Sequence, residues 1–551
     1  MVNKFKTVCL TAAIASSSAT FAGGLLTNTN QHVAFNRMMS REASIGIDGV
    51  YYNPAGVVFM GEGSHLALNW QLAYQTRTIK NDYKLFTNNV NNPTTPRDFK
   101  GKAFAPVIPS FQYAYNKGRW SLQGNFALTG GGGKCTFDNG LGSFEKIVGE
   151  TAMGAIGLAK TIDHVANSIL VPGYPQDPTK FKPMFTDNKV FGSKGDYSFN
   201  SYMHGRQYYF GLSAGAAYKV SDNFSVYAGL RGIYATCNYY GYVEDIKVGN
   251  MQLYKVLDPS KENSANIELS CDQSGIGFTP MLAVDYKTGR WNFSAKYEFK
   301  TRMRLKNKSV NKLPSIGNLD DNLKDQMNKV LTGKFMQAGM PQDQAMIKAE
   351  QTSTAVLNNP TVVATTAGLK QQFDSKINEA LGEYTDGKKI AGDIPSLLTV
   401  GVGYSPIDEL RINVGFHWFD DYNATSHNNR NKLLKKRGTL EFNAGVEYDV
   451  NKKITVSTGW QNTNYGLTDK YMDDKSFVVG SNSVGVGGVY HITKKLDFTV
   501  AYFHTFYNTV KTSEIVTLPG MESLPDNKKP KYNSEYTRNN NAFAAGVNIT
   551  F

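Results

Sequence analysis

The sequence lacks any apolar run that approaches the roughly 18 residues a membrane-spanning helix requires, although the chain has 551 residues. This absence excludes a helical membrane protein. Aromatic residues nevertheless make up 12% of the chain, while the mean hydropathy is −0.37. That combination is typical of alternating strands, in which lipid-facing residues are diluted by polar neighbours. We therefore expect one large closed sheet rather than the several soluble domains that this length would otherwise suggest.

Cysteine is scarce as well. Of the four cysteines, Cys9 lies in an apolar N-terminal stretch that we expect to be removed. The other three, Cys135, Cys237 and Cys271, are an odd number and too few for a disulfide framework. Cys237 and Cys271 fall near the far ends of adjacent expected strands, so they could form one disulfide or remain free thiols.

Catalytic and metal-binding motifs are missing too. The run GLSAG at Gly211–Gly215 resembles a hydrolase nucleophile elbow, but it lies inside an alternating strand rather than at a strand-to-helix turn. The run GGGGK at 130–134 lacks the spacing and the Ser or Thr of a phosphate-binding loop. The eight histidines are scattered, without an HExxH or a close Cys/His cluster. We expect neither an enzyme nor a cofactor or metal site.

The charge balance is basic but dispersed. The 59 Lys and Arg residues exceed the 46 Asp and Glu residues, and the excess is spread over expected loops and turns. We interpret it as solvated surface, which suits contact with anionic outer-membrane lipids or sugars. No recognisable nucleic-acid-binding module accompanies it, so we expect no nucleic-acid partner.

The N-terminus has the features of an export signal. Residues 1–22 combine Lys4 and Lys6, an apolar stretch over 8–15, and small residues before Ala22. This order is that of a secretory signal peptide, and cleavage after Ala22 would leave Gly23 as the mature N-terminus.

From Ser64 onward the sequence repeats one pattern. An alternating run ends in tyrosine, a short polar turn follows, and the next run opens on a large apolar residue. The terminal tyrosines are Tyr115, Tyr218, Tyr286, Tyr404, Tyr448 and Tyr490. Aromatic rings beside short turns are typical of the interfacial girdle of a membrane barrel. Seven long connections alternate with the six short turns, which predicts a 14-stranded antiparallel barrel over residues 64–551.

Two of the long connections have helical composition. Residues at about 141–170 and 319–381 are rich in Ala, Lys, Gln, Met and Leu, with Pro341 and Pro360 expected to break the second segment. On the outer surface these helices could form an apolar catching groove or a lid without ligand contact.

Residues 23–63 are neither helix-periodic nor strand-periodic. Asn53, Pro54, Ala55 and Gly56 form a turn signal beside a group of apolar and aromatic residues. We expect this segment to be a plug, or hatch, that lies inside the barrel and gates it.

The expected wall has one weak place. Pro106 and Pro109 each remove a donor from the second strand, and the third strand contains Gly124 and ends in a glycine run. Weakened pairing there could leave a lateral opening in the barrel, or it could be a sealed bulge that only sets curvature.

Two cations are expected to face the lumen. By parity with outward-facing Leu230 and Phe293, Arg231 and Lys296 point inward, where they could hold a ligand carboxylate. The alternative is that they pair with inward-facing acids such as Glu298, Glu441 or Glu447.

The run GGLLTNTNQHVAFNRMMSREASIGIDGVYYNPAG, with Asn53, Pro54 and Ala55, resembles the hatch of the FadL family of outer-membrane long-chain fatty acid transporters. The terminal Phe551 resembles the signal that outer-membrane assembly machinery recognises. The resemblance implies a monomeric, hatch-plugged barrel in the outer membrane. It further implies that a hydrophobic, fatty-acid-like molecule is captured outside and leaves sideways through the wall after the hatch shifts.

Two other functions remain open from the sequence. A porin-like diffusion channel for polar solutes would need a continuously charged lumen that the hatch does not block. A surface adhesin or receptor would use the helical loops over 319–381 to bind a partner, without any need for transport.

Overall fold

The computed structural model describes residues 27, 30–186, 194–314, 316, 318–426, 430–475, 477–518, 521 and 523–551. The expected signal peptide and the first residues of the expected plug therefore lie outside the described residues. The wall strands are β1 (Gly63–Tyr83), β2 (Arg97–Lys117), β3 (Trp120–Phe137), β4 (Tyr197–Lys219), β5 (Phe224–Val248), β7 (Ile267–Thr288), β8 (Trp291–Glu298), β11 (Leu397–Ile407), β12 (Leu410–Phe419), β13 (Thr439–Asn451), β14 (Ile454–Asn464), β15 (Ser481–Thr493), β16 (Leu496–Tyr507) and β18 (Lys531–Thr550).

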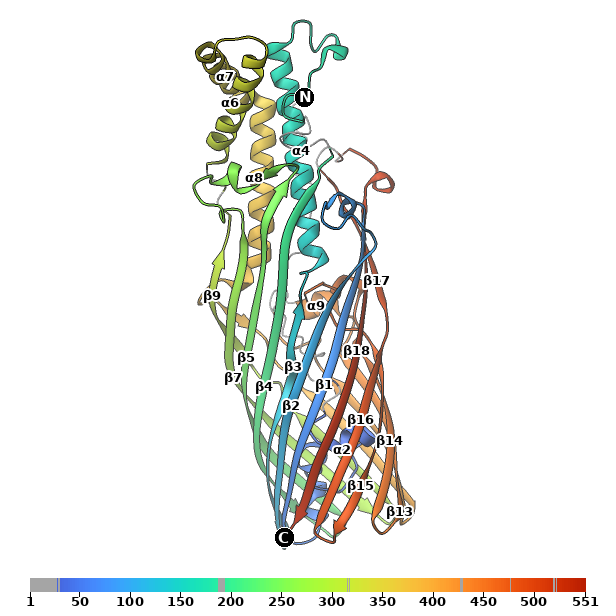
Figure 1. The fold of residues 1–551 in the computed structure, drawn as a ribbon. Coiled ribbons are helices and arrows are strands. Elements are labelled where there is room, and N and C mark those ends of the chain that lie inside the picture. The colour runs from blue at the N-terminus through green and yellow to red at the C-terminus, as the bar shows by residue number, and fades with distance from the viewer. Residues whose placement is uncertain are drawn as a thin grey trace.

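These strands form a closed antiparallel barrel, shown in Figure 1. β1 pairs with β2 on one side and with β18 on the other, the second ladder running from His65–Thr550 to Tyr83–Tyr532. The 18 strands of the sheet include four short ones: β6 (Met251–Gln252), β9 (Arg304–Lys312), β10 (Lys389–Ala391) and β17 (Val510–Ile515). The last three extend the ladders of β8, β11 and β16 outward. Fourteen wall strands remain, which confirms the predicted barrel.

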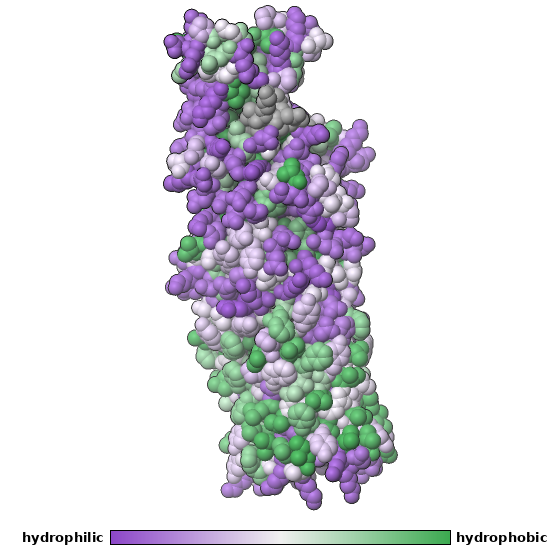
Figure 2. Space-filling model, in the orientation of Figure 1, coloured by the Kyte–Doolittle hydropathy of each residue, from purple (hydrophilic) through white to green (hydrophobic). Residues whose placement is uncertain are grey.

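The outer surface of the barrel has an apolar band at the end with the short turns. Figure 2 shows this band over the lower part of the strands and a hydrophilic surface above it. Outward-facing Trp70, Tyr74 and Phe104 are exposed within the band, whereas outward-facing Lys80 and Lys102 lie above it. Because turns are short on the periplasmic side of such barrels, the band identifies the membrane zone and the opposite end is extracellular.

The strands continue far beyond the band on one side of the barrel. β1, β2, β4, β5, β7 and β18 have 20–25 residues, whereas β11 to β16 have 10–13. A membrane crossing takes only about 10 residues per strand. The strand ends above the membrane, at 77–83, 97–102 and 241–248, show no alternation in hydropathy because both of their faces carry polar residues.

Helices stand on this taller side, as Figure 1 shows. The segments expected to be helical correspond to α4 (Gly142–Leu170) and to α6 (Leu319–Gln337), α7 (Gln342–Leu357) and α8 (Pro360–Leu381), with short α5 (Tyr254–Leu257) beside α6 and α9 (Arg430–Leu434) in a later loop. Pro341 and Pro360 mark the breaks between α6, α7 and α8 because proline lacks the amide donor that a helix interior needs. Leu158 and Ile162 of α4 are buried together with Leu323 and Met327 of α6. Within the described residues, no helix is long and apolar enough to cross a membrane.

The described part of residues 30–62 lies inside the lower barrel, where Figure 1 shows α2. It contains α2 (Val33–Met38), α3 (Gly49–Tyr52) and a 3₁₀ turn over Gly56–Phe59. We call residues 30–62 the N-terminal segment. Its side chains are almost all buried, and Phe35, Met39, Tyr51 and Tyr52 pack against the inner wall.

The inner wall makes room for this segment with glycines. Lumen-facing glycines on β11 to β15 and β18 lie against the backbone and side chains of residues 33–43; they are Gly401, Gly403, Gly415, Gly445, Gly459, Gly485, Gly487 and Gly546. A Cβ atom on Gly459 would clash with the Met38 carbonyl, and one on Gly485 would clash with the Asn36 carbonyl. Close approach of two backbones therefore requires glycine at these positions.

Cys237 and Cys271 do not form the disulfide that the sequence left open. Cys135, Cys237 and Cys271 are all buried and free. On the β5–β7 ladder Cys237 is opposite Gln273 and Cys271 is opposite Tyr239, so the two thiols are offset by two residues rather than directly paired.

We predict that Gly459→Ala will displace the N-terminal segment without unfolding the barrel. The added methyl clashes with the backbone of α2, and overpacking of this kind costs about 1–3 kcal/mol. Single-channel recording in planar bilayers should then show a higher ion conductance than wild type. Gly124→Ala is the control, since its Cβ would meet nothing closer than 3.8 Å. Equal conductance in all three proteins would show that the segment does not obstruct the lumen.

Candidate functional site

A cavity of about 230 Å³ lies in the lumen directly outside the N-terminal segment. Thr27 and Asn30 form its floor, and Lys475, Phe477 and Val478, in the connection between β14 and β15, reach into it from the extracellular side. We call this space the lumen cavity. We call the residues that reach in from the extracellular side, Lys475, Phe477 and Val478, the roof of the cavity. The apolar lining residues come mainly from β1 to β4 and from the roof, and include Ala73, Ala103, Ala105, Ile108, Phe137, Met203, Phe477, Val478 and Phe503.

The wall beside this cavity is broken. β2 and β3 are paired from Lys102 to Phe104 and again from Ser110, but not over residues 105–109 of β2 and 128–133 of β3. The register differs by one residue on the two sides of the gap, and β3 is also irregular against β4. Ala105, Ile108 and Gly131–Gly133 line the lumen cavity, so the cavity extends to the break. We call residues 105–109 and 128–133 the wall break.

The expected weak place is only partly where the sequence indicated. Pro106 and Pro109 lie inside the wall break, where their missing amide donors do not have to be paired. Gly124 lies outside the wall break, in the regular ladder opposite Tyr113 of β2 and Ala214 of β4. The glycines that face the prolines are Gly130–Gly133, of which Gly131 and Gly133 have φ of 86° and 71°. These left-handed conformations, rather than one isolated glycine, end the pairing.

Side chains satisfy part of the backbone that the break leaves unpaired. On the lipid side, Trp70 Nε1 donates to the Pro106 carbonyl at 3.0 Å. On the lumen side, Gln31 Nε2 donates to the Leu128 carbonyl at 2.8 Å. The second bond connects the N-terminal segment directly to the edge of the wall break. Gln112 Nε2 donates in turn to the Gln31 carbonyl at 2.9 Å. These bonds matter because an unpaired backbone group at membrane depth is costly.

The turn of the expected hatch is bound to the periplasmic end of the wall. Asn53 Nδ2 donates to Asp285 Oδ2 at 2.6 Å, and Asn53 Oδ1 accepts from Gly56 N at 3.2 Å. The carbonyls of Pro54 and Ala55 accept from Gln123 Nε2 and Ser225 Oγ, each at 2.7 Å. Asn53, Pro54, Ala55 and Gly56 therefore fix the last turn of the segment below the lumen cavity, and none of them lines it.

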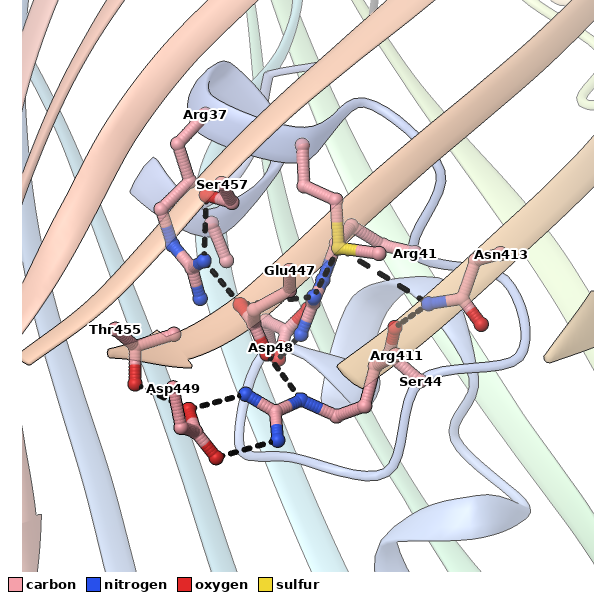
Figure 3. A network of polar contacts seen from close by, with 12 residues as sticks. Arg37, Arg41, Ser44, Asp48, Arg411, Asn413, Glu447, Asp449, Thr455 and Ser457 are labelled. Atoms are coloured by element: carbon pink, nitrogen blue, oxygen red, sulfur yellow. Dashed lines mark hydrogen bonds and ion pairs between the residues drawn. The ribbon is translucent and has the colours of Figure 1, made fainter. Parts of the chain in front are cut away.

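Ion pairs hold the segment on the opposite side, as shown in Figure 3. Arg37 pairs with Glu447 of β13, and Arg41 pairs with Asp48 within the segment, its Nε lying 2.7 Å from Asp48 Oδ2. Arg411 of β12 also pairs with Glu447, at 2.7 Å. Breaking a buried pair leaves an uncompensated charge and costs several kcal/mol. This network was not predicted from the sequence, although Arg37 and Arg41 within an otherwise apolar segment were a visible signal.

A second buried contact joins the segment to the same wall. Both ring nitrogens of His417 lie against carboxylates, Nε2 at 2.5 Å from Glu42 Oε1 and Nδ1 at 2.9 Å from Glu441 Oε2. Asn443 Nδ2 donates to Glu42 Oε1 at 3.0 Å. The segment is thus held by charged contacts on β12 and β13, and by neutral amide contacts on β2 and β3.

The two cations expected to bind a ligand carboxylate already share one carboxylate of the wall. Arg231 Nη1 lies 2.7 Å from Glu298 Oε2, and Lys296 Nζ lies 2.8 Å from Glu298 Oε1. Lys296 also donates to the Tyr51 carbonyl at 2.7 Å, and both cations lie over the Tyr51 ring. Neither lines the lumen cavity. The structure therefore supports the alternative of pairing with Glu298, because a buried cation needs a partner.

Two further cavities lie along the molecule. A polar one of about 360 Å³ lies on the periplasmic side of the N-terminal segment and is lined by charged residues such as Arg37, Arg411 and Asp449. An apolar groove of about 120 Å³ lies among α4, α5, α6 and α8, lined by residues such as Leu158 and Phe373. The described residues contain no group of His, Cys, Asp and Glu that could hold a metal ion.

The roof of the lumen cavity is held by one buried carboxylate. Asp474 Oδ2 accepts from Ser143 N at the start of α4 at 2.7 Å, and its two oxygens accept from the Tyr532 and Tyr536 hydroxyls. Burial raises the pKa of Asp474 to about 6, and the neighbouring Asp473 adds to the effect. The roof thus depends on a group that titrates near neutral pH.

No family model matches the sequence, and no curated protein matches it significantly. Solved structures match it in fold. A Pseudomonas aeruginosa FadL homologue has a TM-score of 0.55 at 13% identity, over 96% of this chain and 100% of that chain. The Pseudomonas putida toluene transporter TodX has a TM-score of 0.45 at 11% identity, over 92% and 94%. The Ralstonia pickettii toluene transporter TbuX has a TM-score of 0.45 at 14% identity, over 94% and 97%. The first likeness confirms the expected fold: the chain has the β-barrel fold of that FadL homologue.

We predict that Asp474→Asn stabilises the protein at pH 7.5 but not at pH 4. The folded-state pKa of about 6 lies above the ordinary value of 3.8, so the stability that the protonated group provides is complete below about pH 4 and is lost as the pH rises through 6. At high pH, the free energy of unfolding of the variant should exceed that of wild type by up to about 3 kcal/mol. Thermal unfolding in detergent at both pH values measures it, with Asp408→Asn in an exposed turn as control. A constant difference across pH would contradict the titration.

Proposed function

We propose that this chain, which has the fold of the FadL-type outer-membrane barrels, is a passive uptake channel for hydrophobic molecules, long-chain fatty acids among them. Ligand is captured at the extracellular helices, enters the lumen cavity and leaves laterally through the wall break into the membrane. The N-terminal segment acts as the gate. The single observation that carries this proposal is that the lumen cavity reaches the wall break at Ala105, Ile108 and Gly131–Gly133.

The position of the wall break supports lateral release. Tyr74 and Phe104 are opposite each other at the top of the apolar band, and exposed Val107 lies within the break just below them. The break therefore faces the outer leaflet. For an acyl chain of about fifteen methylenes, release into water would cost on the order of 12 kcal/mol, at about 0.8 kcal/mol each. Passage into lipid avoids that cost, whereas a water-filled pore does not.

The apolar groove among α4, α5, α6 and α8 is suited to first contact. Leu158, Leu257, Leu323 and Phe373 line it, and it lies above the barrel on the extracellular side. Its small size fits an acyl chain or an aromatic ring rather than a folded protein.

The contacts of the N-terminal segment indicate which side would open. On the β12–β13 side it is held by Arg37–Glu447 and Glu42–His417, which are charged and buried. On the side of the wall break it is held by neutral bonds, which include those from Gln31 to the Leu128 carbonyl and from Gln112 to the Gln31 carbonyl. A neutral hydrogen bond contributes about 1 kcal/mol, less than a charged one. Opening at the Gln31 side, with the ionic side as pivot, therefore costs least.

A porin-like channel for polar solutes remains the second candidate, because the cavity on the periplasmic side of the segment is polar and larger, at about 360 Å³. The N-terminal segment lies between that cavity and the lumen cavity. Residues 27 and 30 line the lumen cavity, and residues within 32–48 line the polar cavity on the periplasmic side.

An adhesin or receptor that uses the helical loop 319–381 is distinguished from a channel by deleting this loop. A receptor would lose partner binding and keep uptake, whereas the channel would lose capture of hydrophobic ligand.

We predict that Gly132→Trp blocks uptake. Gly132 lines the lumen cavity, and a Cβ placed on it would meet nothing within 4 Å, so we expect the backbone there to accept a larger side chain and the indole to obstruct the wall break. Uptake of a radiolabelled long-chain fatty acid and of toluene by cells that express the variant should fall at least tenfold relative to wild type.

Gly132→Ala is the matched control, because it changes the same backbone position without filling the passage. It should retain uptake close to wild type. Conductance for small ions should be similar in wild type and both variants. If Gly132→Trp transported hydrophobic solutes at the wild-type rate, the lateral route would be excluded. A block of sugar or amino acid uptake instead would favour the porin-like alternative.

A further inference from the structure

The outer face of the barrel carries a group of cations directly above the apolar band on its taller side. Lys134 of β3 is directly opposite Arg206 of β4, and Lys102 of β2 lies diagonally beside Lys134. Lys102 and Lys134 are exposed, and Arg206 is partly exposed. We call these three residues the cation cluster. Like charges that are directly opposite each other on antiparallel strands destabilise the sheet.

No carboxylate compensates the cation cluster. None of its three residues takes part in an ion pair within the described part of the chain, although other cations on this side of the molecule do. Arg206 Nε is buried without a hydrogen-bond partner, and the Arg206 guanidinium lies 5.6 Å from the centre of the Tyr208 ring. The next acid along the same ladder, Asp272, is two strands away and accepts from Asn238 Nδ2 at 2.8 Å. The cation cluster can therefore bind an anion from outside the protein.

The cation cluster lies at the level of the membrane interface. Lys134 is opposite Phe104, which marks the top of the apolar band together with Tyr74. On β4, the exposed Phe210 lies four residues below Arg206. Lysine and arginine reach lipid head groups from such positions while their alkyl stems stay against apolar surface. Lipid phosphates are the anions at this level, so the position of the cluster favours a lipid phosphate as its partner.

Four aromatic side chains form a second group on the same outer face. Tyr202 and His204 of β4 are directly opposite Tyr242 and Tyr240 of β5, and all four are partly exposed. The Tyr202 and Tyr242 rings are stacked with their centroids 5.8 Å apart, and the His204 and Tyr240 centroids are 5.6 Å apart. We call these four residues the ring cluster. His204 Nε2 donates to Asn238 Oδ1 at 2.9 Å, and the Tyr202 hydroxyl donates to His204 Nδ1 at 3.2 Å, which fixes the imidazole beside the tyrosines.

The ring cluster lies too high to belong to the aromatic girdle of the membrane. Tyr202 is four residues above Arg206, or about 13 Å along the strand. The head-group zone of a bilayer is only about 5–7 Å deep on each side, and girdle aromatics lie within it. Packing against lipid therefore does not account for these rings. An aromatic surface beside hydroxyl and amide groups is suited to sugar, because the C–H face of a pyranose stacks on the electron-rich face of an aromatic ring.

From these two clusters we propose that the outer face of β2 to β5, which lie side by side in Figure 1, binds a phosphorylated glycolipid of the outer leaflet. Its acyl chains lie along the apolar band, a phosphate group lies between Lys134 and Arg206, and its sugars extend upward over the ring cluster. An ordinary phospholipid has a phosphate but no sugar at the height of Tyr202. A soluble sugar has no acyl chain to hold it against the band. The site is outside the barrel and does not depend on the proposed function.

Native mass spectrometry of the detergent-solubilised protein tests the site with three lipids at equal concentration. They are a lipooligosaccharide with a phosphorylated head, the same lipid after removal of its phosphates, and its phosphorylated disaccharide anchor without core sugars. We expect wild type to bind the complete lipid roughly tenfold more tightly than the dephosphorylated one, and also more tightly than the anchor. The triple variant Lys102→Gln, Lys134→Gln, Arg206→Gln should lose the preference for phosphate but keep the preference for core sugars. The double variant Tyr240→Ala, Tyr242→Ala should do the reverse.

The matched control removes three exposed lysines from the periplasmic turns. Lys452→Gln, Lys453→Gln and Lys495→Gln together change the net charge by the same amount at the other end of the barrel, and should leave both preferences unchanged. Heat-modifiable migration in dodecyl sulfate gels checks that every variant is folded. Lys134→Gln alone, which alters one exposed side chain, should lower the preference for phosphate about threefold.

Equal binding of the phosphorylated and dephosphorylated lipids by wild type would overturn the inference. An equal loss of binding in the triple variant and its matched control would overturn it too, because net charge alone would then explain the effect. Displacement of the lipid by inorganic phosphate at the same concentration would assign the cation cluster to a soluble anion instead. A preference for core sugars that survives in the double tyrosine variant would contradict the placement of the sugars on the ring cluster.

Discussion

The structure depends on one constraint: every backbone amide and carbonyl inside hydrocarbon must be hydrogen bonded. Closure of the sheet between β1 and β18 satisfies it almost everywhere, with an unbroken ladder from His65 to Tyr83. The wall break is the exception, and the molecule compensates for it with Trp70 on the lipid side and Gln31 on the lumen side. In the proposed function, this break is the place where ligand leaves the barrel sideways.

The N-terminal segment connects that break to the far wall. Its backbone lies against glycines of β11 to β15, its cations pair with β13, and its Gln31 reaches the edge of the break. The contacts are charged on the β12–β13 side and neutral on the β2–β3 side, and the proposed gating rests on this asymmetry. The same segment separates the lumen cavity from the polar cavity on the periplasmic side. The lumen cavity is partly apolar and has only basic charged residues in its lining, whereas the periplasmic cavity is lined by both acidic and basic residues.

Charges inside the barrel follow two patterns. Arg37, Arg231, Lys296 and Arg411 each have a carboxylate partner and contribute to holding the fold. Arg77 and Arg538 have only the amide oxygen of Gln75 between them.

Features that rest on local pattern could be predicted from the sequence alone. Two-residue alternation with tyrosines at short turns gave the number of wall strands, the helical composition of 141–170 and 319–381 marked α4 and α6 to α8, and Pro106 and Pro109 marked the weak strand. Only the tertiary structure decided what depends on pairing between distant residues. Gly124 lies in an intact ladder while Gly130–Gly133 face the prolines, Arg231 and Lys296 are bound by Glu298, and Arg77 meets Arg538 from the other end of the chain. The strands also run on above the membrane, where no lipid imposes an apolar face and the alternation that reveals a strand disappears. Register and closure join residues hundreds of positions apart, and no local pattern carries that information.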